Sequence, residues 1–245
     1  MRNIRLLIEY DGANYAGWQW QKNEKTIQET LSYAIEQVVQ EKIILYGASR
    51  TDAGVHAVGQ VANFRTHSVI PSQRLVYAIN YYLPPDITVK KAADVPESFH
   101  AQYCAGSKIY RYTLFNSWIR TSLNRNFCYV YGFQLRMDKM ITAAGYLTGT
   151  HDFTSFTTKA RGEKNRIRTI KRLDIKREGE KVFFTIEADG FLYNMVRTIV
   201  GTLLETGRGK IKPAEVNDIV SAKDRKRAGP TAPAMGLCLM EVKYE

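Results

Sequence analysis

Apolar residues recur with regular periods along most of the chain, and these periods predict a mixture of strands and helices. From Ile4 to Tyr10, every second residue is apolar or aromatic. This alternation is typical of a strand with one buried face. Thr26 and Glu29 have the spacing of a helix capping box, and apolar residues follow at helical intervals as far as Val38. The chain is therefore expected to open with a strand and a helix.

The same reasoning predicts further elements along the chain. Pro71 suits the first turn of a helix, and Pro84 and Pro85 would end that helix. The segment 178–180, EGE, has the composition of a hairpin turn. The remaining predicted strands are 43–47, 58–66, 87–95, 109–115, 127–131, 167–176, 182–188 and 237–242, and the predicted helices are 71–83, 138–149 with Asp138 as its cap, 193–206, and a last helix opened by Pro213.

Both halves of the chain mix strands with helices and contain hairpins, so we predict an α+β fold built from two related halves. Each half is expected to hold a largely antiparallel sheet, as RRM-like and ferredoxin-like domains do. We place the boundary near residue 105. This gives an N-terminal domain of residues 1–105 and a C-terminal domain of residues 106–245.

The charge of the chain points to a polyanionic partner. Lys and Arg number 35 against 24 Asp and Glu, which gives a net charge of +11. Basic residues gather at 159–168, where 161–164 is expected to be a surface loop, at 171–172 and at 223–227, although each cluster alone is more often a solvated surface. Together with 15 Tyr and 10 Phe that can stack on bases, they favour nucleic acid over a membrane surface.

Several classes of protein are excluded by what the sequence lacks. The scattered Cys104, Cys128 and Cys238 do not form a disulfide framework and fit a reducing compartment. No segment has the pattern of a signal peptide or a membrane span, so we expect a cytoplasmic protein with no membrane partner. Motifs of P-loop, zinc-protease and zinc-deaminase sites are missing, and the four histidines lack ligand-like spacing. We therefore expect no metal site and no cofactor.

One short loop concentrates the candidate chemistry. Residues 46–57, YGASRTDAGVHA, join two predicted strands. Gly47 and Gly54 allow the backbone to fold back closely, which would present Asp52 at the end of a sheet. Arg50 could keep the Asp52 carboxylate ionised or reach into a groove. Asp52 could act as a general base or a nucleophile, although most loop carboxylates only shape turns or form ion pairs.

Residues 49–57, SRTDAGVHA, closely resemble the catalytic motif of the TruA family, the tRNA pseudouridine synthases. Other segments are similar to family motifs in the same order and spacing, so the resemblance extends over essentially the whole chain. One variation is Ser49, where many members carry glycine and some carry serine. The other matching segments are 10–12, 17–21, 99–101, 108–112, 152–156, 194–197 and 236–239, with Val242 and Tyr244.

The resemblance implies the pseudouridine synthase fold, with an active-site cleft between the two halves. It also implies isomerisation of uridine in the anticodon arm of tRNA by a homodimer, which makes tRNA and a second copy of the chain the expected partners. Such a reaction needs no redox cofactor and no energy source. In the family the motif aspartate acts on the uridine nucleotide, and the matching residue is Asp52. Attack on the base, attack on the sugar and abstraction of a sugar proton all remain open.

The resemblance also gives expected roles to three other side chains. Arg50 is a candidate to fill the space that a flipped uridine leaves in the RNA, because a guanidinium can stack and hydrogen-bond at once; an ion pair with Asp52 is an equally simple interpretation. Tyr110 matches the family tyrosine that lies against the target base, although its alternating strand alone would place it in the core. Arg197 matches the arginine that pairs with the catalytic carboxylate, and we interpret His56 as structural.

Two other classes of function stay open at this point. A non-catalytic RNA-binding module of paired RRM-like halves would also be basic and aromatic, but the sequence has no RNP1-type run, and Asp52 would repel phosphate. A hydrolase that uses Asp52 and His56 would need an oxyanion or metal partner, and the sequence shows neither.

Overall fold

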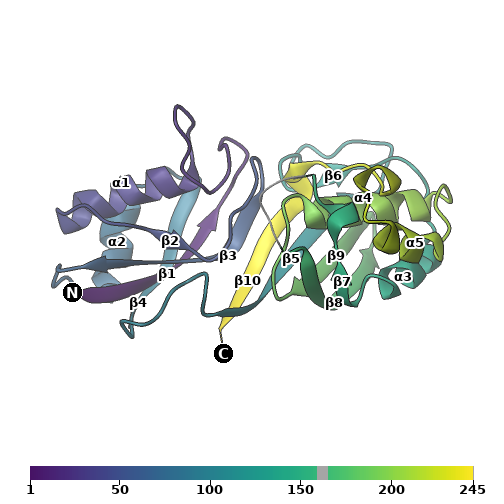
Figure 1. The fold of residues 1–245 in the computed structure, drawn as a ribbon. Coiled ribbons are helices and arrows are strands. Elements are labelled where there is room, and N and C mark those ends of the chain that lie inside the picture. The colour runs from purple at the N-terminus through teal and green to yellow at the C-terminus, as the bar shows by residue number, and fades with distance from the viewer. Residues whose placement is uncertain (159–164, 245) are drawn as a thin grey trace. The chain divides into compact units, whose positions relative to one another are not determined.

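The computed structural model describes residues 1–158 and 165–244 (Figure 1), and the chain forms two compact units. The first unit comprises Met1–Gly106 with Cys238–Glu245, and the second comprises Ser107–Leu237. The predicted boundary near residue 105 lies next to this division, whereas the C-terminal strand groups with the first unit. Part of the predicted basic cluster at 159–168, including the predicted surface loop 161–164, lies outside the described residues.

The first unit is a sheet with two helices on one face (Figure 1). The strands lie in the order β4-β1-β3-β10, and the short strand β2 pairs with β3. All neighbours are antiparallel except β3 and β10, which are parallel. The elements are β1 (Arg2–Tyr10), α1 (Ile27–Val39), β2 (Tyr46–Gly47), β3 (His56–Thr66), α2 (Ser72–Tyr82), β4 (Ile87–Val95) and β10 (Leu237–Tyr244).

The core of the first unit lies between the sheet and the helices. The alternation predicted for β1 is confirmed, because Ile4, Leu6, Ile8 and Tyr10 are buried while Arg5 is exposed. Each large apolar side chain buried in this way contributes about 1.5–3 kcal/mol, so the layer holds β1 and β3 firmly in place. The helices contribute the buried side chains Leu31, Ile35, Leu75 and Ile79.

The second unit holds another largely antiparallel sheet, in the order β5-β9-β8-β7, with the short β6 parallel to β5. Helix α4 is buried along almost its whole length. The elements are β5 (Ala105–Phe115), β6 (Tyr129–Val130), α3 (Met137–Gly145), β7 (Gly149–Asp152), β8 (Ile167–Glu178), β9 (Lys181–Ala188), α4 (Met195–Gly207) and α5 (Glu215–Ala222), with short 3-10 turns at Thr154–Phe156, Arg225–Arg227 and Ala234–Gly236.

Most predicted elements are present within a few residues of their expected bounds, and the exceptions have local causes. The strand predicted at 43–47 is reduced to Tyr46–Gly47, since the carbonyl of Leu45 accepts a hydrogen bond from the side chain of Gln28 at 2.9 Å instead of from a neighbouring strand. Asp138 is not the cap of α3; it lies in the first turn of that helix, which begins at Met137.

Two further details complete the comparison of the predicted and observed elements. The helix predicted to reach residue 149 ends at Gly145, because Gly149 begins the unpredicted strand β7, which pairs with β8. The predicted cap of α1 is confirmed: Thr26 Oγ1 accepts from the Glu29 N–H at 3.3 Å. Within the described residues, no helix is both long enough and apolar enough to cross a membrane.

Candidate active site

The loop that carries Arg50 and Asp52 leaves the sheet between β2 and β3. Tyr46 and Gly47 pair with β3, and the Ala48 N–H still donates to a β3 carbonyl at 2.8 Å. The chain rejoins the sheet at His56, the first residue of β3. Asp52 therefore lies at the end of β3, in the position that the sequence predicts.

A buried amide fixes the beginning of this loop. Gln60 on β3 is fully buried, and its Nε2 donates to the Ser49 carbonyl at 2.8 Å while its Oε1 accepts from the Ser49 N–H at 3.3 Å. Leaving a buried polar group without its partner costs about 1–3 kcal/mol, so the pairing strongly favours one conformation at Ser49. Arg50 follows directly from this fixed point.

A second set of contacts holds the residue before Asp52. Thr51 is buried, and its Oγ1 lies 2.8 Å from the hydroxyl of Tyr10. The carbonyl of Thr51 accepts from the Trp18 N–H at 3.0 Å. Because both the side chain and the backbone of Thr51 are held, the direction in which the chain presents Asp52 is set by β1 and by the 11–20 segment.

Glycines in the 10–21 segment allow the backbone to pack directly against the loop. A Cβ atom at Gly12 would lie 2.0 Å from the carbonyl oxygen of Val55, and one at Gly17 would lie 2.5 Å from that of Thr51. Gly17 also has a φ of +104°, in the region that other residues rarely adopt. The two sequence motifs that contain Tyr10 and Gly17 therefore support the loop of residues 46–57.

The two glycines inside the loop serve different purposes. Gly54 has a φ of +75° and makes the tight return that the sequence predicts, and its N–H donates to the Tyr15 carbonyl at 3.3 Å. Gly47 does not adopt a positive φ. It is required because a Cβ atom there would lie 2.4 Å from the ring of Trp18.

His56 joins the start of β3 to the turn after β1. Its side chain is buried, and Nδ1 lies 3.0 Å from Asp11 Oδ1 and 3.1 Å from the Gly12 nitrogen. A protonated ring would donate to the Asp11 carboxylate, and a neutral ring accepts from the Gly12 N–H. In either state the ring ties two segments together, which agrees with the structural interpretation of His56 and supplies the partners that the sequence alone did not indicate.

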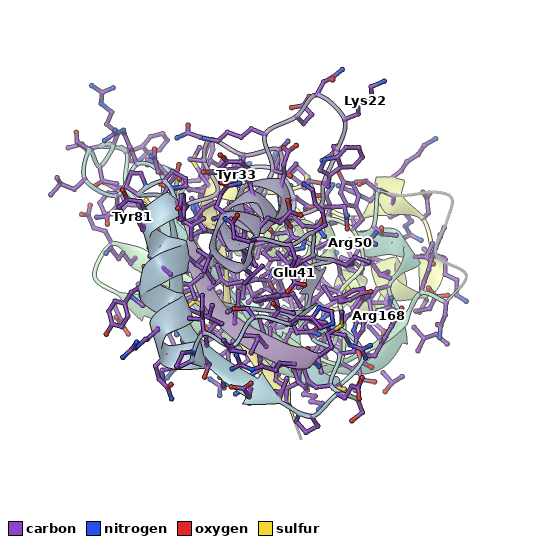
Figure 2. All side chains as sticks on the ribbon, turned by 90° about the vertical axis from the view of Figure 1, so that its left-hand side faces the viewer. Lys22, Tyr33, Glu41, Arg50, Tyr81 and Arg168 are labelled. Carbon is purple, nitrogen blue, oxygen red and sulfur yellow. The ribbon has the colours of Figure 1, made fainter. Side chains whose placement is uncertain are left out.

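Arg50 and Asp52 differ in their surroundings. Arg50 is exposed on the surface of the first unit (Figure 2), and Asp52 is partly buried, with its carbonyl accepting from the Val55 N–H at 3.1 Å. The interpretation of Arg50 as the salt-bridge partner of Asp52 stays a prediction.

Tyr110 lies on β5 in the second unit. Its ring is buried and packs edge to face on Phe191, with 5.1 Å between the ring centroids. Tyr112, two residues further on the same face, is fully buried and donates its hydroxyl proton to the Pro233 carbonyl at 2.8 Å. Burial alone would place both rings in the core, in line with the alternation of the strand.

Arg197 lies on α4, where most neighbouring side chains are buried and apolar. Its Nε donates to the Ala232 carbonyl at 2.7 Å, and one terminal nitrogen donates to Asn194 Oδ1 at 2.8 Å. A partly buried charge needs such acceptors. Both of these acceptors are neutral, and they orient the guanidinium.

The basic cluster at 223–227 is not a uniform surface. Lys223 Nζ lies 3.0 Å from Asp152 Oδ2, and Arg225 donates to backbone and hydroxyl oxygens within 228–231. Burial lowers the pKa of Arg225. Arg225 therefore has a structural role, and contact of the cluster with a polyanion stays a prediction. Lys223, Lys226 and Arg227 are the exposed cations of the cluster, and Lys223 is the one that lies close to Asp152.

An exposed stack of rings lies beside β2, and the sequence did not indicate it. The rings of His100 and Tyr103 stack at a centroid distance of 4.3 Å, and His100 also contacts Tyr46 at 4.8 Å. His100 Nδ1 accepts from the Gln102 N–H at 3.2 Å, which fixes the orientation of the imidazole. Tyr103 remains 79% exposed, so one end of the stack offers an open ring face of the kind that binds unpaired bases.

The described residues offer little for metal or disulfide chemistry. No three His, Cys, Asp or Glu side chains among them are grouped as ligands for a metal ion. Cys104, Cys128 and Cys238 are all free thiols.

Comparison with known proteins identifies the family. Residues 6–104 and 143–245 match the family described as tRNA pseudouridine synthase. The chain belongs to this family. The tRNA pseudouridine synthases A of Acetivibrio thermocellus and Thermoanaerobacter sp. (strain X514) are 52% and 50% identical to it over 244 residues, and that of Clostridium acetobutylicum is 47% identical. Each of these alignments covers 100% of both chains.

A solved structure of a Cbf5-Nop10-Gar1 complex contains a chain that is 11% identical to this synthase, with a TM-score of 0.39. The alignment covers 96% of this synthase and 57% of that chain. The family match confirms the mixed α+β pseudouridine synthase fold, and it confirms that the protein is a tRNA pseudouridine synthase, an isomerase. The non-catalytic RNA-binding module and the hydrolase are thereby set aside.

Proposed function

We propose that this synthase converts uridine to pseudouridine in the anticodon arm of tRNA and that Asp52 acts on the nucleotide. In this reaction the bond between ribose C1′ and N1 of the base breaks, the base rotates, and a bond from C1′ to C5 forms. The hydrogen on C5 leaves as a proton and N1 takes up a proton, so substrate and product are isomers. The observation that carries the proposal is the support of the loop: Ser49, Thr51 and Gly54 are each held by other segments. Such support positions a reacting carboxylate before the substrate binds.

Arg50 is proposed to occupy the space that the flipped uridine leaves. Extruding a base costs a few kcal/mol, and a side chain that stacks in its place can offset part of that cost. Arg50 suits this role because it is exposed. The exposed stack of Tyr46, His100 and Tyr103 supports binding of unpaired nucleotides near the same loop.

Tyr110 and Arg197 are proposed to complete the site, as the residue-by-residue resemblance implies. Tyr110 would lie against the target base, and its contact with Phe191 keeps the ring in one orientation. Arg197 would be the counter-ion of the Asp52 carboxylate. The acceptors supplied by Ala232 and Asn194 hold the guanidinium in place.

Release of tritium tests the reaction and its place in the RNA. Substrates would carry tritium at C5 of uridines either in the anticodon arm or elsewhere in the tRNA. Only isomerisation frees this hydrogen while the base stays attached, so release from the anticodon-arm label supports the proposal. Release only from the other labels would contradict the proposed position, and no release from any label would contradict the reaction.

The exposed pair Lys226 and Arg227 should contribute to the salt dependence of tRNA binding. If both contact phosphates, the double substitution Lys226→Ala/Arg227→Ala should flatten the slope of log affinity against log salt by about 1.4–1.8, at roughly 0.7–0.9 per contact. The measurement is a series of binding titrations at different salt concentrations. Lys223→Ala serves as a comparison, because Lys223 is already paired with Asp152. An unchanged slope in the double variant would show that these two residues are only solvated.

We also propose that the synthase is a homodimer that acts in the cytoplasm, where its substrate would be found. Two copies that grip one tRNA would present two sets of basic residues to it. Light scattering at working concentration should give about twice the 28.0 kDa of one chain. A single species of 28.0 kDa would contradict the dimer.

A further inference from the structure

Two cations lie on the face of the second sheet that also carries Tyr110. Lys108 precedes Tyr110 by two residues on β5, so both side chains lie on one face, roughly 7 Å apart along the strand. Ala188 on β9 is opposite Lys108, and Ile170 on β8 is opposite Ala188. Arg168 is two residues before Ile170 and therefore comes to the same face, at the same end of the sheet.

The guanidinium of Arg168 is held by neutral groups. One of its terminal nitrogens donates to the Ile167 carbonyl at 2.7 Å and to the Asn165 carbonyl at 3.1 Å. Gly190 lies against it, and a Cβ atom there would be 3.3 Å from Arg168 Nε. The residue is therefore oriented by the backbone and still carries its full charge.

Neither cation is neutralised by a carboxylate among the described residues. Asp189 accepts a hydrogen bond from a backbone N–H of β8, and Glu187 accepts one from a serine hydroxyl on the opposite face of the sheet. Burial, together with the nearby positive charge of Arg168, lowers the pKa of Lys108 to about 8. A partly buried ammonium next to a second cation destabilises the fold, and such an arrangement is typical of a site that awaits an anion.

We propose that Lys108 and Arg168 form a subsite that binds a phosphodiester group of the RNA substrate beside Tyr110. The inference rests on the proposed function, which places the target base against Tyr110. The base and phosphate of one nucleotide are joined through a single ribose, so a phosphate at Lys108 and a base at Tyr110 belong to the same nucleotide or to neighbours. The subsite positions the uridine for reaction and takes no part in breaking or forming bonds.

The first test compares Lys108→Met with Lys176→Met in tRNA binding. Both changes remove one positive charge and keep a long side chain, but Lys176 is exposed on β8. Lys108→Met should weaken tRNA binding about tenfold near 0.1 M salt. It should also flatten the slope of log affinity against log salt by about 0.7–0.9, as expected for one lost phosphate contact. Lys176→Met should match the wild type, and Lys108→Arg should restore the slope. If Lys108→Met keeps the wild-type slope, the subsite is wrong.

The second test is the thermal stability of Lys108→Met without RNA. The folded-state pKa of Lys108, about 8, lies below its ordinary value of 10.5, so below pH 8 the fold holds a charge that burial disfavours. Lys108→Met should therefore melt at a higher temperature than the wild type at pH 7. The difference should shrink as the pH rises from 8 to 10.5, because the folded wild type then binds fewer protons than its unfolded chain and gains stability.

A lower melting temperature of Lys108→Met at pH 7 would show that Lys108 is a paired structural residue and would overturn the proposal. Neither the salt slope nor the melting temperature depends on turnover. Tritium release by the wild type therefore tests the reaction separately, and a failure of the anion subsite can be told apart from a failure of the proposed function.

Discussion

Asp52→Asn should reduce tritium release by at least roughly 10³-fold while the fold and the affinity for tRNA are kept. The amide is nearly isosteric with the carboxylate, but it cannot act as a nucleophile or as a base. The contacts that hold the loop involve Ser49, Thr51 and Gly54 and do not depend on the Asp52 side chain. Loss of a negative charge near RNA phosphates should leave binding unchanged or make it tighter.

Asp218→Asn is a matched control for this experiment, since it makes the same change at an exposed position on α5. It should leave tritium release and binding at the wild-type values. Single-turnover release and tRNA binding would be measured for both variants. Substantial turnover by Asp52→Asn would remove Asp52 from its proposed role, and a loss of binding without a loss of the single-turnover rate would make it a binding residue.

Local patterns were sufficient to predict most of the fold. The alternation of apolar residues predicted β1 and the hairpin of β8 and β9. The positions of prolines predicted both ends of α2 to within one residue of the observed bounds. The errors arose where a distant group competes for the backbone, as Gln28 does for the carbonyl of Leu45. The pairing of β10 with β3 joins residues 238 and 56, and no local period carries that information.

The candidate site was predictable to different degrees. Asp52 could be found because charge and glycine are concentrated in one loop, whereas Tyr110 and Arg197 look like ordinary strand and helix residues without the family resemblance. Gln60 was missed, although a glutamine within an apolar strand is a signal that a buried polar group has a specific partner. Lys226 and Arg225 are indistinguishable in sequence, and only the fold shows which of them is bonded to the backbone.

Arg197→Met should lower both stability and activity, and the proposed pairing with Asp52 can be measured by a double-mutant cycle. The substitution removes the hydrogen bonds to Ala232 and Asn194, each costing about 1–3 kcal/mol if a buried acceptor stays unsatisfied. If Arg197 is also the counter-ion of Asp52, the substitution leaves an unpaired carboxylate, which lowers the stability further. Breaking a buried ion pair costs about 3–5 kcal/mol of stability. Adding Asp52→Asn should then recover part of the stability and none of the turnover.

The recovery in this cycle should be partial, because Asp52→Asn cannot restore the two hydrogen bonds of Arg197. We expect a coupling of about 0.5–3 kcal/mol between the two positions in denaturant unfolding of the wild type, both single variants and the double variant. Asn194→Gly is the control: it removes one acceptor of Arg197, tolerates the φ of +60° at this position, and keeps both charges. Asn194→Gly should not couple to Asp52→Asn to the same extent. If the losses from Arg197→Met and Asp52→Asn simply add, Arg197 supports α4 locally and is not the partner of the Asp52 carboxylate.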